Sequence, residues 1–188
     1  MKKNYKSTVN ACFAGYVVQA IVNNFVPLLF LTFNKSYGIE LSKITALITV
    51  NFILQLIIDL LSAFFIDKIG YRAAAIMAHV FAAAGLVSLT VLPEILPSPF
   101  VGLLISVVLY AVGGGLLEVI VSPIVEACPT DNKEKMMSLL HSFYCWGSVA
   151  VVGISTLYFS IFTTANWKYL ALICCLLYTS DAADDRIS

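Results

Sequence analysis

Two carboxylates stand in a stretch that is otherwise almost free of polar side chains, GGGLLEVIVSPIVEACP, residues 113–129. Glu118, Ser122 and Glu126 are spaced four residues apart, so a helix would align them on one face. A carboxylate within an apolar helix can accept hydrogen bonds from a polar solute or carry a proton. Glu126 lies at the end of the run, where it can reach water, whereas Glu118 lies about two helical turns deeper. We therefore interpret Glu118 as the candidate functional acid and Glu126 as a solvated helix end.

A matching stripe of amides lies near the N-terminus. Gly15, Gln19, Asn23 and Pro27 are again four residues apart, and Asn24 lies beside them. Amides offer both donors and acceptors, which suits a ligand rich in hydroxyl groups. Hydrogen bonding between neighbouring helices is the alternative role for Gln19, Asn23 and Asn24. Pro27 frees a backbone carbonyl and permits a kink.

A third stripe contains Asn51, Gln55 and Asp59, again at a spacing of four. Gln55 is a further candidate for binding solute, and Asp59 is a candidate for proton coupling. A structural carboxylate that pairs with a basic residue elsewhere is the open alternative for Asp59.

One of the two histidines, His141, shares a helical face with Cys145 and Ser148. Histidine titrates near neutral pH, so His141 is a candidate for contact with a solute. A hydrogen-bonded filler is the alternative, because no carboxylate accompanies His141 at a fixed spacing.

The composition identifies the elements that must position these residues. The chain of 188 residues is 60% hydrophobic and only 12% charged, and its mean hydropathy is +0.92. Soluble domains carry roughly 25% charged residues, so an integral membrane protein is indicated. A net charge of zero gives no electrostatic case for nucleic acid. The five cysteines form no CxxC pair, so neither a metal nor another cofactor is expected.

Six apolar segments are separated by short polar loops, and a membrane-spanning helix needs about 20 such residues. The expected spans are residues 10–33, 41–66, 73–92, 100–128, 135–162 and 168–177. Transmembrane strands would be about ten residues long and alternate in polarity, so the predicted class is all-α. Asp131 and Glu134 have the spacing of a capping box at the start of the fifth span.

The basic residues predict the orientation. With a cytoplasmic N-terminus, seven Lys and Arg fall inside and three outside, in line with the positive-inside rule. The inner set is Lys2, Lys3, Lys6, Lys68, Arg72, Lys133 and Lys135, and the outer set is Lys35, Lys43 and Lys168. We expect a multi-pass protein of a plasma membrane, such as a bacterial inner membrane.

The C-terminal residues break the apolar pattern. CLLYTSDAADD, residues 175–185, resembles a translated DNA-sequencing adapter. We therefore expect the natural protein to occupy residues 1–174 and the segment 175–188 to be an artefactual tail. A natural polar C-terminus is the alternative.

The loop after the second span, FFIDKIGYR, resembles the signature loop of the major facilitator superfamily. Asp67, Lys68, Gly70 and Arg72 keep the essentials of its pattern, while Ala63 replaces the usual first glycine. The resemblance implies a conformational latch on the cytoplasmic side. It also implies a twelve-helix fold in two six-helix halves, each with an inverted three-plus-three repeat. The chain would then be the N-terminal half, truncated in or after the sixth span and lacking its C-terminal six-helix half.

Within that superfamily, the glycine-rich fourth span with Glu118 and the segment HSFYCWG resemble the fucose-permease-like sugar porters. The resemblance implies that Glu118 takes part in sugar and proton handling. Those porters carry an acid in the first span, where this chain has only Asn23 and Asn24. We expect a secondary transporter, not an enzyme, that moves a small polar solute, with a sugar and H⁺ as the expected partners. Efflux of amphipathic drugs or metabolites and a structural membrane protein without a ligand are the alternatives.

Overall fold

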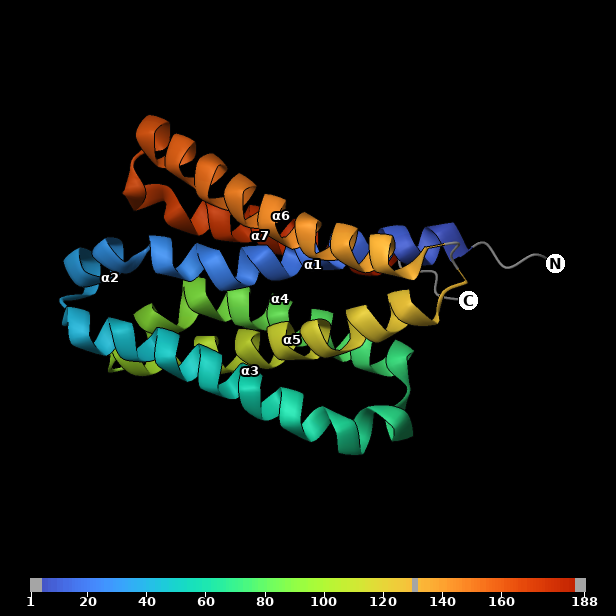
Figure 1. Ribbon diagram of the computed structural model, residues 1–188. Coiled ribbons are helices and arrows are strands. Elements are labelled where there is room, and N and C mark those ends of the chain that lie inside the picture. Colours follow the sequence, from blue (N-terminus) through green and yellow to red (C-terminus); the bar gives the residue numbers. More distant parts are fainter. Residues whose placement is uncertain (1–4, 130–131, 185–188) are drawn as a thin grey trace.

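The computed structural model describes residues 5–129 and 132–184. Seven α-helices and one short 3₁₀ helix account for nearly all of these residues, and no strand occurs among them. The elements are α1 (Tyr5–Leu28), α2 (Phe30–Tyr37), α3 (Leu41–Ile69), α4 (Tyr71–Ile95), α5 (Pro99–Ala127), α6 (Lys133–Phe162), η1 (Thr164–Asn166) and α7 (Trp167–Asp184). The long helices run up and down along one axis, so their connections gather at two opposite ends of the bundle (Figure 1). The all-α prediction is confirmed.

Five helical segments of the described chain are long and apolar enough to cross a membrane. They are Thr8–Leu28, Leu41–Ser62, Tyr71–Ile95, Pro99–Ala127 and Lys133–Phe162. The sixth predicted segment forms α7, which is not among them, because Lys168, Asp181 and Asp184 interrupt its apolar sequence. A sixth span and the inverted repeat therefore stay predictions.

The first predicted span is divided into two helices. Pro27 has no N–H to donate to the preceding turn, and the regular helix ends one residue later, at Leu28. The backbone N–H of Leu29 then donates a hydrogen bond of 3.0 Å to the carbonyl of Val26, three residues before it, which makes a tighter turn than an α-helix. The next helix, α2, continues to Tyr37. A one-residue break at Leu29 therefore separates α1 from α2, two residues after Pro27, while a kink at Pro27 stays a prediction.

The start of α6 is capped by Asn132. The Asn132 side chain accepts a hydrogen bond of 2.9 Å from the backbone N–H of Lys135, as an N-cap residue does. Asp131, which the sequence suggested for this role, lies outside the described residues.

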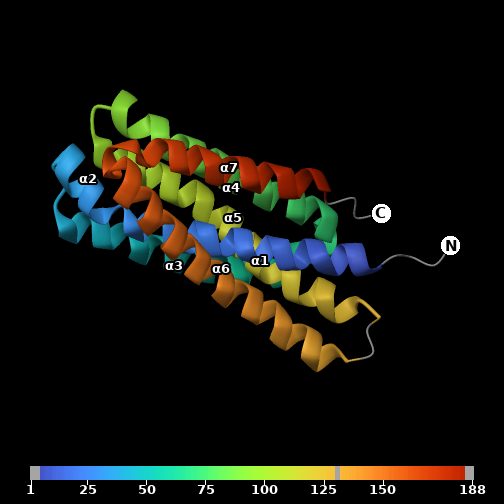
Figure 2. The same cartoon turned by 90° about the horizontal axis from the view of Figure 1, so that it is seen from above.

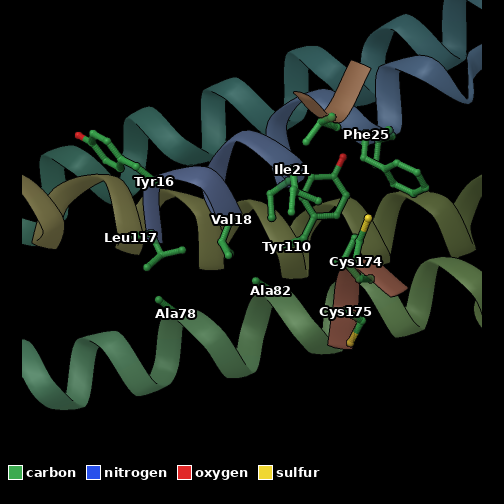
Figure 3. Packing of buried hydrophobic residues seen from close by; sticks show 14 of the residues in the cluster. Tyr16, Val18, Ile21, Phe25, Ala78, Ala82, Tyr110, Leu117, Cys174 and Cys175 are labelled. Atoms are coloured by element: carbon green, nitrogen blue, oxygen red, sulfur yellow. The ribbon is translucent and has the colours of Figure 1, made fainter. Parts of the chain in front are cut away.

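The closest pair of helices is α4 and α5, which pack through small residues. A Cβ atom on Gly113 would lie 2.6 Å from the backbone nitrogen of Ala82. A Cβ on Gly85 would lie 2.5 Å from the backbone nitrogen of Tyr110. Figure 3 shows Ala78 and Ala82 pointing from α4 toward α1 and α5. Without glycine and alanine here, the two backbones could not approach so closely.

Two helices leave most of their surface uncovered by the described chain. In α3, large apolar side chains such as Leu60 and Phe64 are exposed, and in α6 the same holds for Trp146 and Leu157. Figure 2 shows α6 at the edge of the bundle, on the opposite side from α4. Such faces must be covered by lipid or by further protein, because they are unfavourable in water.

Candidate functional site

The three polar stripes converge around α1. This helix contacts α5, α6 and α7, and Gln55 reaches it from α3. Gly147 lets α6 approach closely, since a Cβ there would lie 3.1 Å from the Cβ of Ala20. Gly114 of α5 leaves room for an amide, since a Cβ there would lie 3.2 Å from Nε2 of Gln55. Small residues thus bring four helices near enough for their polar side chains to meet.

The candidate acid is bonded to the first amide stripe. Gln19 Nε2 donates a hydrogen bond of 3.0 Å to Glu118 Oε2. The Gln19 side chain is only 2% exposed, whereas Glu118 remains exposed on the surface of the described chain. Glu126, two turns further along α5, is also exposed and lies at the helix end. The two acids therefore differ in their contacts, since of the two only Glu118 is bonded to an amide of another helix among the described residues, and the functional role of Glu118 stays a prediction.

A second amide group joins α1, α3 and α6. Gln55 Nε2 donates to Asn23 Oδ1 at 2.7 Å and to Asn51 Oδ1 at 3.2 Å. Asn23 Nδ2 in turn donates to the Tyr144 hydroxyl at 3.3 Å. This chain of amides and a phenol crosses three helices, so Asn23 and Gln55 act here as links between helices as well as candidate ligands.

The hydrogen-bonded residues around α1 form one polar zone, which consists of Gln19, Asn23, Asn51, Gln55, Glu118 and Tyr144. Further bonds extend this zone along α1. Asn24 Nδ2 donates to Ser148 Oγ at 3.1 Å and to the backbone carbonyl of its own helix at Ala20. Toward the start of α1, the hydroxyls of Tyr16 and Ser122 are 2.9 Å apart. Four polar side chains of α1 therefore meet a polar partner on another helix: Tyr16, Gln19, Asn23 and Asn24.

Two acceptors in this zone have no donor among the residues that the structure describes. They are Oε1 of Gln19 and Oδ1 of Asp59, and both atoms are buried. Asp59 also lies near enough to Glu118 for their charges to interact. A buried acceptor without a donor is unfavourable by about 1–3 kcal/mol. The arrangement is therefore suited to a solute, water or proton that supplies hydrogen-bond donors.

His141 lies at the margin of this zone. Its ring is exposed and lies 5.7 Å from the ring of Tyr16, centroid to centroid. No hydrogen bond of the His141 side chain is found within the described part of the chain. The histidine is brought near the amides of α1 but is not bonded to them, and its contact with a solute stays a prediction.

The loop between α3 and α4 is a single glycine. Gly70 has φ +83° and ψ 150°, a conformation that is essentially restricted to glycine. Asp67, Lys68 and Arg72 are exposed around it. Their side chains form no hydrogen bond or ion pair with the other described residues. The glycine explains the tight turn, while the latch role of its charged neighbours stays a prediction.

Among the described residues, no group of three or more His, Cys, Asp or Glu side chains lies close enough to share an ion. The amides that dominate the zone also favour hydrogen bonding over coordination of a transition metal.

Two members of this polar zone were not singled out from the sequence. They are Tyr16 and Tyr144, whose hydroxyls bond Ser122 and Asn23. Their spacing held a signal, because Tyr144 lies four residues before Ser148 and Tyr16 lies three before Gln19. Tyrosine is also enriched at the interface between membrane and water, so this spacing did not distinguish them.

The helices and their buried polar zone define a multi-pass helical membrane protein whose polar side chains converge inside the bundle. A family model described as Major Facilitator Superfamily matches residues 11–180, which is most of the chain. The chain belongs to the major facilitator superfamily of membrane transporters, whose members are not enzymes. No curated protein and no solved structure matches the chain.

Proposed function

We propose that the chain forms the N-terminal, cavity-lining half of a secondary transporter that moves a small polar solute, with a sugar or polyol as the first candidate. The observation that carries this proposal is the Gln19–Glu118 hydrogen bond beside two buried acceptors that lack donors. A sugar supplies several hydroxyl donors at once, so it would complement Gln19 Oε1, Asp59 Oδ1 and the Glu118 carboxylate.

The exposed positions of Glu118 and His141 support a second protein surface opposite them. A charged group facing lipid is unfavourable, so these side chains are expected to face a water-filled cavity. A second six-helix half would close that cavity and cover the apolar faces of α3 or α6. The solute would then bind between the halves and cross by alternating access.

The charge at the two ends supports a cytoplasmic N-terminus in a plasma membrane. Lys68, Arg72, Lys133 and Lys135 lie at the end where α3 meets α4 and α5 is followed by α6 (Figure 1). The opposite end carries Lys35, Lys43 and Lys168. With the three lysines that precede residue 7, the first end has the excess of positive charge expected inside the cell. The loop with Asp67, Lys68, Gly70 and Arg72 would then act as the cytoplasmic latch.

Proton coupling is part of the proposal. Glu118 and Asp59 are the only acids within the five candidate spans that lie away from the helix ends, and no Lys or Arg lies near them in the sequence. Asp and Glu residues within membrane spans serve as proton carriers in pumps and transporters. A proton on Glu118 would turn an acceptor into a donor and so change which solute groups it can bind.

Export of an amphipathic cation is the second candidate function. The acids without nearby bases would attract a cation, and an aromatic cluster lies near Glu118, because Tyr16 bonds Ser122 one turn along α5 from this acid. In this cluster Phe13 stacks on Phe143 at 4.7 Å, and Tyr16 contacts Tyr144 edge to face at 6.0 Å. Aromatic faces would bind an organic cation, whereas the amides favour hydroxyl groups.

The test compares Glu118→Gln with Glu126→Gln in cells that produce this chain together with its second half. Uptake of radiolabelled monosaccharides, L-fucose among them, and efflux of tetraphenylphosphonium are measured between pH 5.5 and 8. We expect monosaccharide uptake that depends on a proton gradient, and loss of that dependence in Glu118→Gln alone. The Glu126→Gln variant removes an acid of the same helical stripe and should behave as the parent.

Three results would contradict the proposal. Uptake of Glu118→Gln with an unchanged pH profile would remove the coupling role of Glu118. Efflux of tetraphenylphosphonium without any monosaccharide uptake would favour the cation exporter. Neither activity, from a protein shown to be folded and inserted, would favour a different polar solute or a structural role.

A further inference from the structure

A second polar pocket lies at one end of the bundle, apart from the amides of α1. It has a volume of about 630 Å³ and lies between the end of α2, the end of α4, η1 and the start of α7. Its polar lining comes from Ser36, Tyr37, Thr90, Glu94, Asn166 and Lys168. Sites for small ligands commonly have volumes of about 300–1,000 Å³, so this pocket could hold a headgroup-sized molecule. It lies at the end opposite the α3–α4 turn (Figure 1).

One acid and one base meet at this pocket. Lys168 Nζ, at the start of α7, donates to Glu94 Oε1 at the end of α4. Both side chains remain accessible, at 32% for Lys168 and 54% for Glu94, so each has polar atoms left for another partner. A ligand that carries both a positive and a negative group could add to this pair and alternate the signs of charge around the pocket.

The hydroxyl groups of the pocket add neutral donors. The partial burial of Tyr37 and the nearby Glu94 carboxylate raise the pKa of the Tyr37 phenol above its ordinary value. Tyr37 therefore keeps its proton at neutral pH and can donate to an anionic oxygen. Ser36 is exposed beside it and can do the same.

The walls of the pocket continue into an apolar surface. Tyr169 and Leu172 line the pocket and are 65% and 41% exposed. Further along α7, Ile173 is 48% exposed, and Ile95 is 71% exposed at the end of α4. Tyr169, Leu172 and Ile173 have the three- and four-residue spacing of one helical face, so they form an apolar track that leads from the pocket. Tyrosine and tryptophan also favour the level of lipid headgroups, and the pocket contains Trp167.

We propose that this pocket binds the zwitterionic headgroup of a membrane phospholipid, with its ammonium group at Glu94 and its phosphate at Lys168, and with an acyl chain along Tyr169, Leu172 and Ile173. The mixed charge favours a zwitterionic over an anionic headgroup, because Glu94 would repel a second negative group. The apolar track favours a lipid over a free headgroup, because only a lipid would cover it. This site is independent of the proposed transport of a solute.

The test is native mass spectrometry of the 188-residue chain released from nanodiscs. The nanodiscs contain equal amounts of phosphatidylethanolamine, phosphatidylcholine and phosphatidylglycerol. We expect the protein to retain about five times more of each zwitterionic lipid than of phosphatidylglycerol. One partly exposed ionic contact accounts for a ratio of about this size. Glu94→Gln should remove the preference against phosphatidylglycerol, and Lys168→Gln should lower retention of all three lipids about fivefold.

Matched controls exist at the same end of the bundle. Glu40→Gln and Lys43→Gln remove exposed charges near the start of α3, outside the pocket, and should leave lipid retention unchanged. Thermal unfolding monitored by circular dichroism identifies any variant that fails to fold. The double variant Glu94→Gln, Lys168→Gln keeps both side-chain lengths without leaving a lone charge, so it tests the site even if a single variant is unstable.

Equal retention of the three lipids by the parent chain would overturn the proposal, as would an unchanged lipid profile in the double variant. Free phosphoethanolamine forms a separate arm of the experiment. Displacement of the bound lipid by free phosphoethanolamine at a comparable concentration would show that the apolar track contributes nothing, and the site would then be one for a soluble zwitterion. The proposal expects no displacement at that concentration.

Discussion

Gln19 Nε2 and Glu118 Oε2 lie 3.0 Å apart, which joins the buried amide of α1 to the candidate acid of α5 across 99 positions of sequence. The same amide keeps its Oε1 atom without a donor among the described side chains. The Nε2 atom of Gln19 therefore holds Glu118 in place, and its Oε1 atom remains an acceptor for a further donor. This relationship places the acid and an unsatisfied amide in one zone, which is the basis for the proposed transport site.

Replacement of Gln19 by leucine should weaken solute binding. The substitution removes the Nε2 donor to Glu118 and the Oε1 acceptor that has no donor among the described residues. It puts an apolar side chain of similar size in their place. A hydrogen bond to a charged group contributes about 1.5–3 kcal/mol, so we expect an increase of about tenfold or more in the KM for monosaccharide uptake. Ser142→Ala is the control, because that hydroxyl bonds only the Ser138 carbonyl of its own helix. An unchanged KM in Gln19→Leu would remove Gln19 from the site.

Asn23 and Gln55 should be coupled energetically. Their side chains are joined at 2.7 Å between α1 and α3, whereas Gln55 and Ser148 share no hydrogen bond. A double-mutant cycle with alanine at positions 23 and 55 should give a coupling free energy of about 0.6–1.7 kcal/mol. The free energy of unfolding is measured by titration with sodium dodecyl sulfate in mixed micelles. The cycle for positions 55 and 148 should give a value near zero, and equal values for the two cycles would contradict the geometry.

Gly113→Ala should destabilise the pair of helices α4 and α5. The new Cβ would lie 2.6 Å from the Ala82 nitrogen and 2.7 Å from the Ala78 oxygen, so the backbones must separate. Overpacking of this kind is unfavourable by about 1–3 kcal/mol. Gly153→Ala in α6 meets no atom within 4 Å and should leave stability unchanged or slightly higher. Thermal unfolding in detergent checks both variants, and equal midpoints would contradict the close approach.

Gly70→Ala should strain the α3–α4 turn. Its φ of +83° and ψ of 150° lie in a backbone region that residues other than glycine rarely adopt. Holding an alanine there destabilises the fold by about 1–3 kcal/mol. Gly38 also has a positive φ, but its φ of 63° and ψ of 22° lie in the left-handed helical region. Asparagine tolerates that region, so Gly38→Asn should change stability little. A smaller loss of stability in Gly70→Ala than in Gly38→Asn would show that the turn relaxes on substitution.

Much of the fold followed from local sequence properties. The apolar segments became α3, α4, α5 and α6 near their predicted bounds, because helices are the simplest way to satisfy backbone groups in lipid. The break that follows α1 lies two residues beyond Pro27, the residue at which the sequence predicted a kink. The α7 segment was harder to assign, because Lys168, Asp181 and Asp184 interrupt its apolar run and a sequence does not state the depth of a helix.

The candidate site followed from sequence only as separate stripes. A spacing of four residues aligned Gln19 with Asn23, and Glu118 with Ser122, since each alignment lies within one helix. The pairing of Gln19 with Glu118, and of Asn24 with Ser148, depends on how helices rotate and approach each other. The spacing also could not place Tyr16 and Tyr144 in the polar zone, because their role depends on Ser122 and Asn23 of other helices.

The sequence by itself determined that this protein is a bundle of apolar helices with a few aligned polar residues, because hydropathy and helical periodicity are local properties of the chain. The tertiary structure alone decided which of these residues share a zone and which acceptors stay without donors. Contacts between helices are set by small residues far apart in the sequence, such as Gly114 beneath Gln55 and Gly147 against Ala20. Only when those helices pack together do an amide and an acid separated by 99 positions become neighbours.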